Sequence, residues 1–335
     1  MEKIISRIHR IKLPIPFPLK STNVYYIHDS IPTLIDTGIN TDESFDKLSS
    51  AIADCGGSLS KIQRIILTHG HPDHMGMAGR LTQYCDAAVY LHQWEQNKLL
   101  LGADKAHAFH KKCYLKFLNS TGLSENIKQE ISMEILLRHS HIYSQITNPQ
   151  IIQDGHLFQF DDFNLKTIHC PGHSSGSICL FDKTSEILFA GDTVLNHITP
   201  NPAVEVIPFP EAPDYQSLTN YRLSLKKLHT LPISKVFPGH GSPFNNGNDR
   251  IKAILNHHIE RRRDVINIIS NYQADHNNAE NGMYMYQISQ QLFPNVTQNE
   301  TFLCLSESSG YLDMLLDENI IKKNITARGN LYSLI

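Results

Sequence analysis

Short apolar runs separated by turn residues dominate the first ninety residues of the chain. They predict strands over Ile4–Leu13, Val24–Ile27, Thr33–Ile35, Arg64–Leu67 and Ala87–Leu91. A helix is expected to begin near Thr41-Asp42-Glu43, because polar and acidic residues favour helix N-termini. Strands that alternate with helices predict an α/β layered fold.

A long polar stretch, Glu95 to about Ile146, interrupts this rhythm. It has few glycines and is predicted to be a mainly helical insertion that caps the site. A second series of strands follows, over Leu157–Phe160, Leu165–His169, Ser177–Phe181, Ile187–Ala190 and Val236–Phe237. Two strand series of similar size favour a sandwich of two sheets, although no sequence repeat proves a duplication.

The pattern changes again after Gly247. A strong helical pattern covers Arg250–Ser270, and shorter ones lie near Tyr286–Phe293 and Tyr311–Asn319. The chain then forms a hairpin-like turn around Gly329-Asn330. Helices followed by a terminal hairpin favour a winged-helix domain. We therefore expect a first domain over 1–249, with the insertion at about 95–146, and a second over 250–335.

Composition narrows the class of protein. The 335 residues suit two domains, and an apolar fraction of 41% excludes a disordered chain. The 30 basic and 33 acidic residues give a net charge of −3, which excludes a strongly basic nucleic-acid-coating protein. Residues 251–335 alone carry seven Lys and Arg against nine Asp and Glu, so the tail is expected to be a partner or dimer surface.

Cysteine usage and the N-terminus indicate the compartment. The six cysteines include no C-x-x-C pair, which favours a reducing environment. The first twenty residues lack the apolar core of a secretory signal, and no apolar run approaches the length of a membrane span. We expect a cytoplasmic protein without membrane segments.

Histidine is unusually frequent, with 19 residues, and its placement is informative. Thr68-His69-Gly70-His71-Pro72-Asp73-His74 follows directly after a predicted apolar strand. So many imidazoles and a carboxylate would leave polar atoms unpaired in a core. Two imidazoles two residues apart can face one cation, and Asp73 with His74 can face a second. The motif therefore predicts a metal site at a strand end.

Three later segments repeat this design of an apolar strand, a glycine and a metal-ligand side chain. They are Cys170-Pro171-Gly172-His173, Ala190-Gly191-Asp192-Thr193 and Pro238-Gly239-His240-Gly241. Glycine lets the backbone pass close to a site without steric cost. Each segment alone is weak evidence, but four such clusters in one chain strongly indicate a metal centre.

In these four motifs and their order, roughly over residues 1–245, the chain resembles the metallo-β-lactamase superfamily of hydrolases. The resemblance implies a four-layer αββα sandwich. It also implies that His69, His71 and His173 bind one metal, that Asp73, His74 and His240 bind a second, and that Asp192 bridges the two. This nitrogen and oxygen ligand set suits two divalent ions, zinc first, with iron or manganese as alternatives.

The superfamily resemblance also implies a mechanism. Metal-bound water has a strongly lowered pKa, so a hydroxide shared by two metals is available at neutral pH. Asp73 and Asp192 are then the catalytic carboxylates, with Asp73 both binding metal and orienting the hydroxide.

Differences from three branches of the superfamily narrow the choice of enzyme class. Where the flavodiiron oxidoreductases carry a glutamate, this chain has His71, which disfavours a redox di-iron centre. True β-lactamases lack a bridging aspartate at the place of Asp192, which disfavours antibiotic hydrolysis. The gap from Asp192 to His240 is too short for the inserted domain of the β-CASP nucleases.

The tail resembles that of the LACTB2-like subgroup, which adds a small winged helix and includes a single-strand endoribonuclease.

Our first hypothesis for the function is hydrolysis of an acyl-type bond (ester, thioester or lactone) in a small molecule. The alternative is cleavage of single-stranded RNA, and a non-catalytic binding module ranks last because all seven ligands are present. His197, Asn201 and Tyr215 are expected to contact substrate, and the tail surface could pair two copies as a homodimer.

Overall fold

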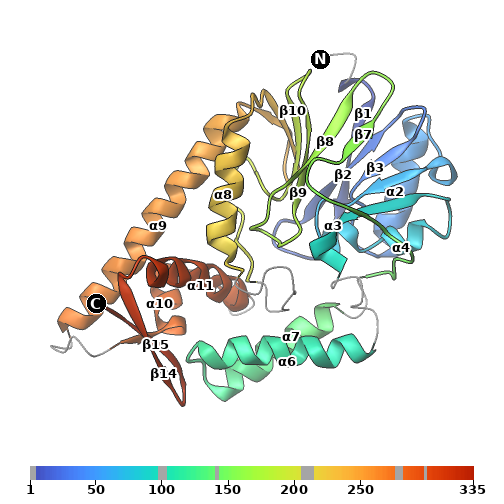
Figure 1. The fold of residues 1–335 in the computed structure, drawn as a ribbon. Coiled ribbons are helices and arrows are strands. Elements are labelled where there is room, and N and C mark those ends of the chain that lie inside the picture. Colours follow the sequence, from blue (N-terminus) through green and yellow to red (C-terminus); the bar gives the residue numbers. More distant parts are fainter. Residues whose placement is uncertain (1–4, 97–103, 140–142, 205–214, 276–281, 298–299) are drawn as a thin grey trace.

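The computed structural model describes residues 5–96, 104–139, 143–204, 215–275, 282–297 and 300–335 (Figure 1). Its first six-stranded sheet has the order β1-β2-β3-β4-β5-β6. The pairs β1/β2 and β2/β3 are antiparallel, and β3 to β6 are parallel. These strands are β1 Ile8–Pro14, β2 Ser21–Ile27, β3 Thr33–Ile35, β4 Arg64–Ile66, β5 Ala88–His92 and β6 Gln150–Ile152. The strand predicted over Ile4–Leu13 begins at Ile8 in the described residues, and Ile4 itself lies outside them.

The second six-stranded sheet has the order β12-β11-β10-β9-β8-β7. Its only parallel pair among the described strands is β10/β11. The strands are β7 Leu157–Gln159, β8 Asn164–His169, β9 Ile178–Asp182, β10 Ile187–Gly191, β11 Lys235–Pro238 and β12 Phe244–Asn245. They match the second predicted series and add the short β12.

The two sheets pack face to face, and helices cover their outer faces (Figure 1). Aromatic and branched side chains of both sheets, such as Ile66 and Phe189, form the central core. The helix α2 (Asp42–Asp54) buries Leu48 and Ile52 against the first sheet, and its N-cap Thr41 accepts a hydrogen bond from the amide of Ser44. The helices α8 (Ser217–His229) and α9 (Gly247–Asp275) cover the second sheet. This architecture confirms the predicted αββα sandwich. Shorter helices on the first sheet's side are η1 Leu59–Lys61, α3 Pro72–Met75, α4 Ala78–Leu81 and η2 Gln93–Glu95.

The C-terminal part is a bundle of helices with a three-stranded sheet of order β13-β15-β14. After α9 its elements are β13 Met283–Tyr284, α10 Met285–Leu292, α11 Thr301–Asp317, β14 Ile321–Thr326 and β15 Gly329–Leu334. The hairpin turns where the sequence predicts it, whereas α11 begins well before the predicted Tyr311. The interpretation as a winged helix, and the division of the chain near residue 250, stay predictions.

Helix α9 connects the two parts of the molecule. Its first turns place Ile251 and Ile254 in the core beneath the second sheet. Its later turns place Val265 and Ile269 in the core of the C-terminal part. One continuous helix thus contributes to both cores.

In its described residues, the predicted helical insertion forms two long helices, α6 (Asp104–Ser120) and α7 (Glu125–His139). Leu118, Leu123 and Ile131 from this segment pack in the same core as the C-terminal helices. The amide of Tyr286 donates to the carbonyl oxygen of Thr121 at 2.9 Å. The insertion therefore lies beside the C-terminal part, next to β14 and β15 (Figure 1), rather than only over the sandwich. No helix of the described ranges is long and apolar enough to cross a membrane.

Candidate metal centre

The predicted ligands lie together at one edge of the sandwich, where parallel strands of both sheets end. His69 follows β4, and His71 is the N-cap of α3, which carries Asp73 and His74 on its single turn. From the second sheet come His173 in the loop after β8, Asp192 after β10 and His240 after β11. The structure brings all seven predicted residues together.

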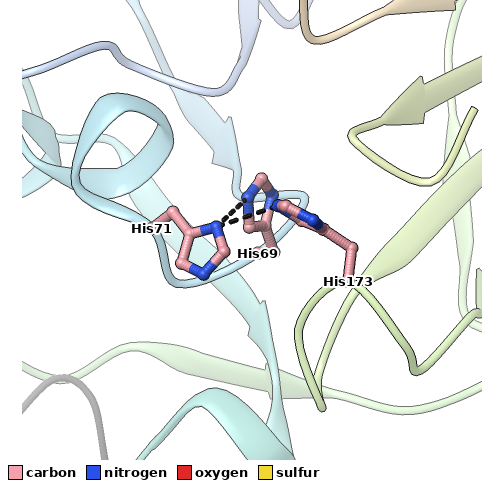
Figure 2. A group of neighbouring side chains, drawn as sticks. All are labelled: His69, His71 and His173. Atoms are coloured by element: carbon pink, nitrogen blue, oxygen red, sulfur yellow. Dashed lines mark hydrogen bonds between the residues drawn. The ribbon is translucent and has the colours of Figure 1, made fainter. Parts of the chain in front are cut away.

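The first group comprises His69, His71 and His173 (Figure 2). The Nε2 of His69 and the Nε2 of His173 each lie 3.0 Å from the Nδ1 of His71. A tetrahedral zinc ion with Zn–N bonds of about 2.0–2.1 Å holds its ligand nitrogens roughly 3.3 Å apart. The nitrogens of this group therefore stand at nearly the spacing that one such ion requires.

The second group comprises Asp73, His74 and His240. The Nε2 of His240 lies 3.3 Å from the Oδ2 of Asp73 and 3.4 Å from the Nε2 of His74. Asp192 lies between the two groups. Its Oδ2 is 3.2 Å from the Nε2 of His240 and 3.5 Å from the Nε2 of His173. One carboxylate is thus within reach of both.

Hydrogen bonds on the far side of the rings fix which nitrogen faces the centre. The Nδ1 of His173 donates to the carbonyl oxygen of Asn201 at 2.8 Å, and the Nδ1 of His240 donates to that of Ser21 at 2.7 Å. An imidazole that binds a metal is neutral and carries one proton, so a proton on Nδ1 leaves the lone pair of Nε2 for the metal. Such outer partners are the usual orienting device of metal-binding histidines.

Asp36 is a residue of the candidate site that the sequence reasoning missed. Its Oδ2 accepts from the Nδ1 of His74 and from the hydroxyl of Thr68, both at 2.8 Å, and its Oδ1 accepts from the amide of Thr68 at 2.7 Å. The same hydroxyl lies 3.0 Å from the Nδ1 of His69 and can accept its proton. Asp36 therefore orients two imidazoles, one directly and one through Thr68. A signal was present, because Asp36-Thr37-Gly38 is also a carboxylate directly after an apolar strand.

The electrostatics of the metal-free chain differ between the two groups. Burial, reinforced by the neighbouring imidazoles, lowers the pKa of His69 well below its ordinary value. Burial would raise the pKa of Asp192, but His240 and His74 outweigh it and hold that pKa well below its usual range. Burial opposes the charge of His240 as well, yet Asp192 and Asp73 raise its pKa to about 10. The first group thus offers a neutral imidazole, and the shared Asp192 stays ionised beside the protonated His240 of the second group.

Two further observations test whether the residues fit a cation. The Oδ1 of Asp192 is buried and makes no hydrogen bond among the described residues, and only the Nε2 of His74, at 3.5 Å, forms an ion pair with it there. A buried carboxylate oxygen without a hydrogen bond is costly, and a cation would compensate it. Gly239 keeps the space beside this oxygen free, since a Cβ there would lie 2.2 Å from it and 2.7 Å from the Cε1 of His74. The donor set and this space fit divalent metal ions.

The Gly239→Ala variant tests this space. Gly239 is not in a left-handed conformation, so the added methyl group changes only the packing. We expect a loss of about tenfold or more in metal affinity, because even an outer-shell disturbance of a metal site costs this much. Chelator competition measures the affinity, and thermal unfolding of the metal-free variant is the control for the fold. Unchanged affinity would show that the space plays no part in metal binding.

A buried glutamate holds the loop that carries His173. Glu95, at the end of η2, accepts hydrogen bonds from the hydroxyl of Ser174 and, at 3.0 Å, from the amide of Gly176. A Cβ on Gly176 would lie 2.5 Å from the Cγ of Glu95. The start of the insertion is therefore fastened to the metal centre. At its end, the hydroxyl of Tyr143 donates to the carbonyl oxygen of Gly70 at 3.2 Å.

The three predicted substrate contacts take different places. His197 is exposed beside the His240 loop, because a Cβ on Gly241 would lie 2.4 Å from its Cε1. The main-chain oxygen of Asn201 accepts a hydrogen bond from the Nδ1 of His173, and its side-chain amide donates to the carbonyl oxygen of Leu303 at 2.8 Å. Tyr215 stands edge-to-face with Trp94 at 6.3 Å between ring centroids. A substrate role stays a prediction for all three.

Comparison with known proteins agrees with this geometry. The model of a family described as the metallo-beta-lactamase superfamily matches residues 18–240. A probable metallo-hydrolase, YqjP of Bacillus subtilis, is 30% identical over 316 residues, which cover 93% of this chain and 92% of that protein. The acyl-coenzyme A thioesterase MBLAC2 of Gallus gallus is 28% identical and covers 71% of this chain and 78% of its own length.

Solved structures share the architecture over nearly the whole chain. A metallo-beta-lactamase family protein of Thermus thermophilus, TTHA1429, superposes with a TM-score of 0.81 at 22% identity and covers 98% of this chain and 99% of its own. A beta-lactamase domain protein of Burkholderia ambifaria has a TM-score of 0.75 at 21% identity, with coverage of 98% and 93%. At these identities the likeness concerns the fold alone. Together with the family match and the 30% identical relative, it leads to one conclusion: the chain belongs to the metallo-beta-lactamase superfamily and is a hydrolase.

Proposed function

We propose that this chain hydrolyses an acyl-type bond, a thioester in the first instance, at a centre of two divalent metal ions. The observation that carries the two-ion proposal is the place of Asp192. Its Oδ2 lies 3.2 Å from the Nε2 of His240 and 3.5 Å from the Nε2 of His173, which belong to different groups. A single carboxylate between two ligand groups is what a pair of neighbouring ions requires.

In this proposal His69, His71 and His173 hold one ion and Asp73, His74 and His240 hold the other, with Asp192 shared. Zinc is the first choice for this ligand set, and iron or manganese are the alternatives. Two such ions, when bound, supply a Lewis acid for the substrate oxygen and lower the pKa of water to near neutrality.

The chain's own residues supply position and proton transfer. Asp73 is the carboxylate that can hold the attacking water by its second oxygen, since only its Oδ2 faces His240. His71 and His173 are half-buried, whereas Asp73, His74 and Asp192 are buried. Substrate therefore reaches the centre from the side of the first group. His197, exposed beside the His240 loop, remains our proposed contact for the part of the substrate that stays outside.

The acyl class is supported by the relatives. Besides the acyl-coenzyme A thioesterase named above, an atrochrysone carboxyl ACP thioesterase of Cryptosporiopsis sp. is 26% identical over 277 residues, which cover 82% of this chain and 66% of that protein. The balanced charge of the chain supports a small-molecule substrate over a long polyanion.

The six cysteines are all free thiols, which supports the predicted reducing, cytoplasmic environment.

The test is a parallel assay of the zinc-loaded protein on acetyl-, hexanoyl- and palmitoyl-coenzyme A and on a fluorescent single-stranded RNA. We expect thiol release from at least one thioester and no RNA cleavage. The Asp73→Ala variant should lose the thioesterase activity by about 100-fold or more, because an inner ligand matters at least as much as an outer one.

The reverse result would replace the proposal. RNA cleavage that disappears in Asp73→Ala, with an affinity that falls steeply as salt rises, would favour the endoribonuclease. Activity on neither substrate, in a protein that holds two metals, would leave the site in place but would refute the thioester class.

A further inference from the structure

Residues 192–204, here called the site loop, carry both Asp192 and Asn201. The loop follows β10 and contains no helix or strand. Its main-chain groups must therefore find hydrogen-bond partners outside the loop. These partners hold Asp192 in place, and with it Asn201, whose carbonyl oxygen accepts from His173.

The partners come from the helices that follow in the sequence. The hydroxyl of Tyr221 in α8 donates to the carbonyl oxygen of Thr193 at 2.6 Å. Arg250 in the first turn of α9 donates twice, from Nε to the carbonyl oxygen of Leu195 and from Nη2 to that of Ile198, both at 2.6 Å. A guanidinium has the fixed fork of donors that two neighbouring acceptors require.

Helix α11 binds the end of the loop next to the metal centre. The side-chain amide of Asn201 donates to the carbonyl oxygen of Leu303 at 2.8 Å, and the hydroxyl of Ser306 accepts from the amide of Val204 at 2.6 Å. The carbonyl oxygen of Asn201 in turn accepts the Nδ1 proton of His173. Through the single residue Asn201, the first turns of α11 are thus connected to the ring of His173, a proposed metal ligand.

We propose that α9 and α11 are part of the metal centre, with Arg250 and Asn201 as positioning residues that hold the site loop. The inference rests on the proposed metal centre and adds the reason why the C-terminal helices are needed for it. Without Arg250 the carbonyl groups of Leu195 and Ile198 turn to solvent, and the loop between Asp192 and Asn201 loses its fixed course. The C-terminal part is then a structural component of the hydrolase and not a separable module.

The experiment compares Arg250→Met with Arg222→Met, in the full-length protein. Arg222 is a matched control, because it is also partly buried and donates to a main-chain oxygen, that of Leu255 at 3.3 Å, away from the site loop. We expect both variants to lower the unfolding temperature of the metal-free protein by a few degrees. Only Arg250→Met should lower zinc affinity, by about 10- to 100-fold in chelator competition.

Arg250→Lys should lie between wild type and Arg250→Met, since one ammonium group lacks the fork that reaches two carbonyl oxygens. Equal zinc affinities of Arg250→Met and Arg222→Met would overturn the role of α9. Zinc affinity is measured without substrate, so a wild-type protein that binds zinc but is inactive on thioesters would refute the proposed substrate and leave this inference standing.

Asn201→Ala and the milder Ser306→Ala test the contribution of α11. We expect lower zinc affinity and lower kcat in both, with little change in KM. A raised KM at unchanged zinc affinity would instead make Asn201 a substrate contact and overturn the positioning role. Ser306→Ala keeps the test available if Asn201→Ala folds poorly, because it removes one acceptor from the same attachment.

Discussion

Replacement of Asp192 by alanine is expected to remove the second metal ion and to lower kcat/KM by at least about 100-fold. Its carboxylate lies between the two histidine groups, within 3.5 Å of a nitrogen in each. Loss of an outer partner of a metal ligand already costs about 10- to 100-fold in affinity or activity, so a ligand shared by two ions should cost more. Metal content by elemental analysis and turnover of the active thioester are measured on the same sample.

His240→Ala provides the comparison. Among the seven proposed ligands, His240 contacts the second group and Asp192 in the described structure, so its loss should empty the second site while His69, His71 and His173 keep the first. Zinc affinity of the first site should fall in Asp192→Ala but stay near wild type in His240→Ala. Two bound metals and full activity in both variants would contradict the whole site assignment.

Replacement of Asp36 by asparagine is expected to lower metal affinity by about 10- to 100-fold, although Asp36 contacts no metal in the proposed site. The amide group would present donors to the Thr68 hydroxyl and to the Nδ1 of His74, which both need an acceptor. Asp36 has a φ of 62°, a left-handed conformation that asparagine also tolerates, so the backbone can stay as it is. Buried donors without acceptors should also cost about 1–3 kcal/mol of stability.

Asp182→Asn is the matched control for this prediction. Asp182 is likewise buried, at the far end of β9, and accepts from the amide and hydroxyl of Ser185 at 2.7 and 2.6 Å. Its replacement should lower the stability similarly without a change in metal affinity. If both variants bind zinc equally well, the proposed orienting role of Asp36 is wrong and its hydrogen bonds serve the fold alone.

The insertion links the C-terminal tail to the active centre. It is fastened to the metal centre at both ends, through Glu95 and Tyr143, and its helices share a core with the C-terminal part. The site loop is held by the same C-terminal helices. Two independent segments therefore connect the tail to the active centre. This arrangement favours the interpretation of the tail as part of the enzyme, and a surface for a second copy of the chain stays a prediction.

The sequence by itself identified the seven residues that the structure brings together, and it predicted the sandwich that presents them. Each ligand stands directly after a short apolar strand or on the turn that follows it, and such local patterns are visible without a structure. A dense group of imidazoles and carboxylates has no place in an apolar core, so its chemistry could be inferred as well. The two strand series predicted two sheets because strand formation depends on local alternation and turn residues.

Only the tertiary structure decided how these residues are oriented and supported. The acceptors of the His240 and His173 rings are main-chain oxygens 219 and 28 residues away, and that of the His74 ring is a carboxylate 38 residues away. Main-chain oxygens are present at every position, so no sequence pattern distinguishes the ones that face a ring. The helices of the insertion were predictable, but not their packing against the tail. An apolar face shows that a helix must be buried, and it does not show against which core, because the hydrophobic effect has no direction.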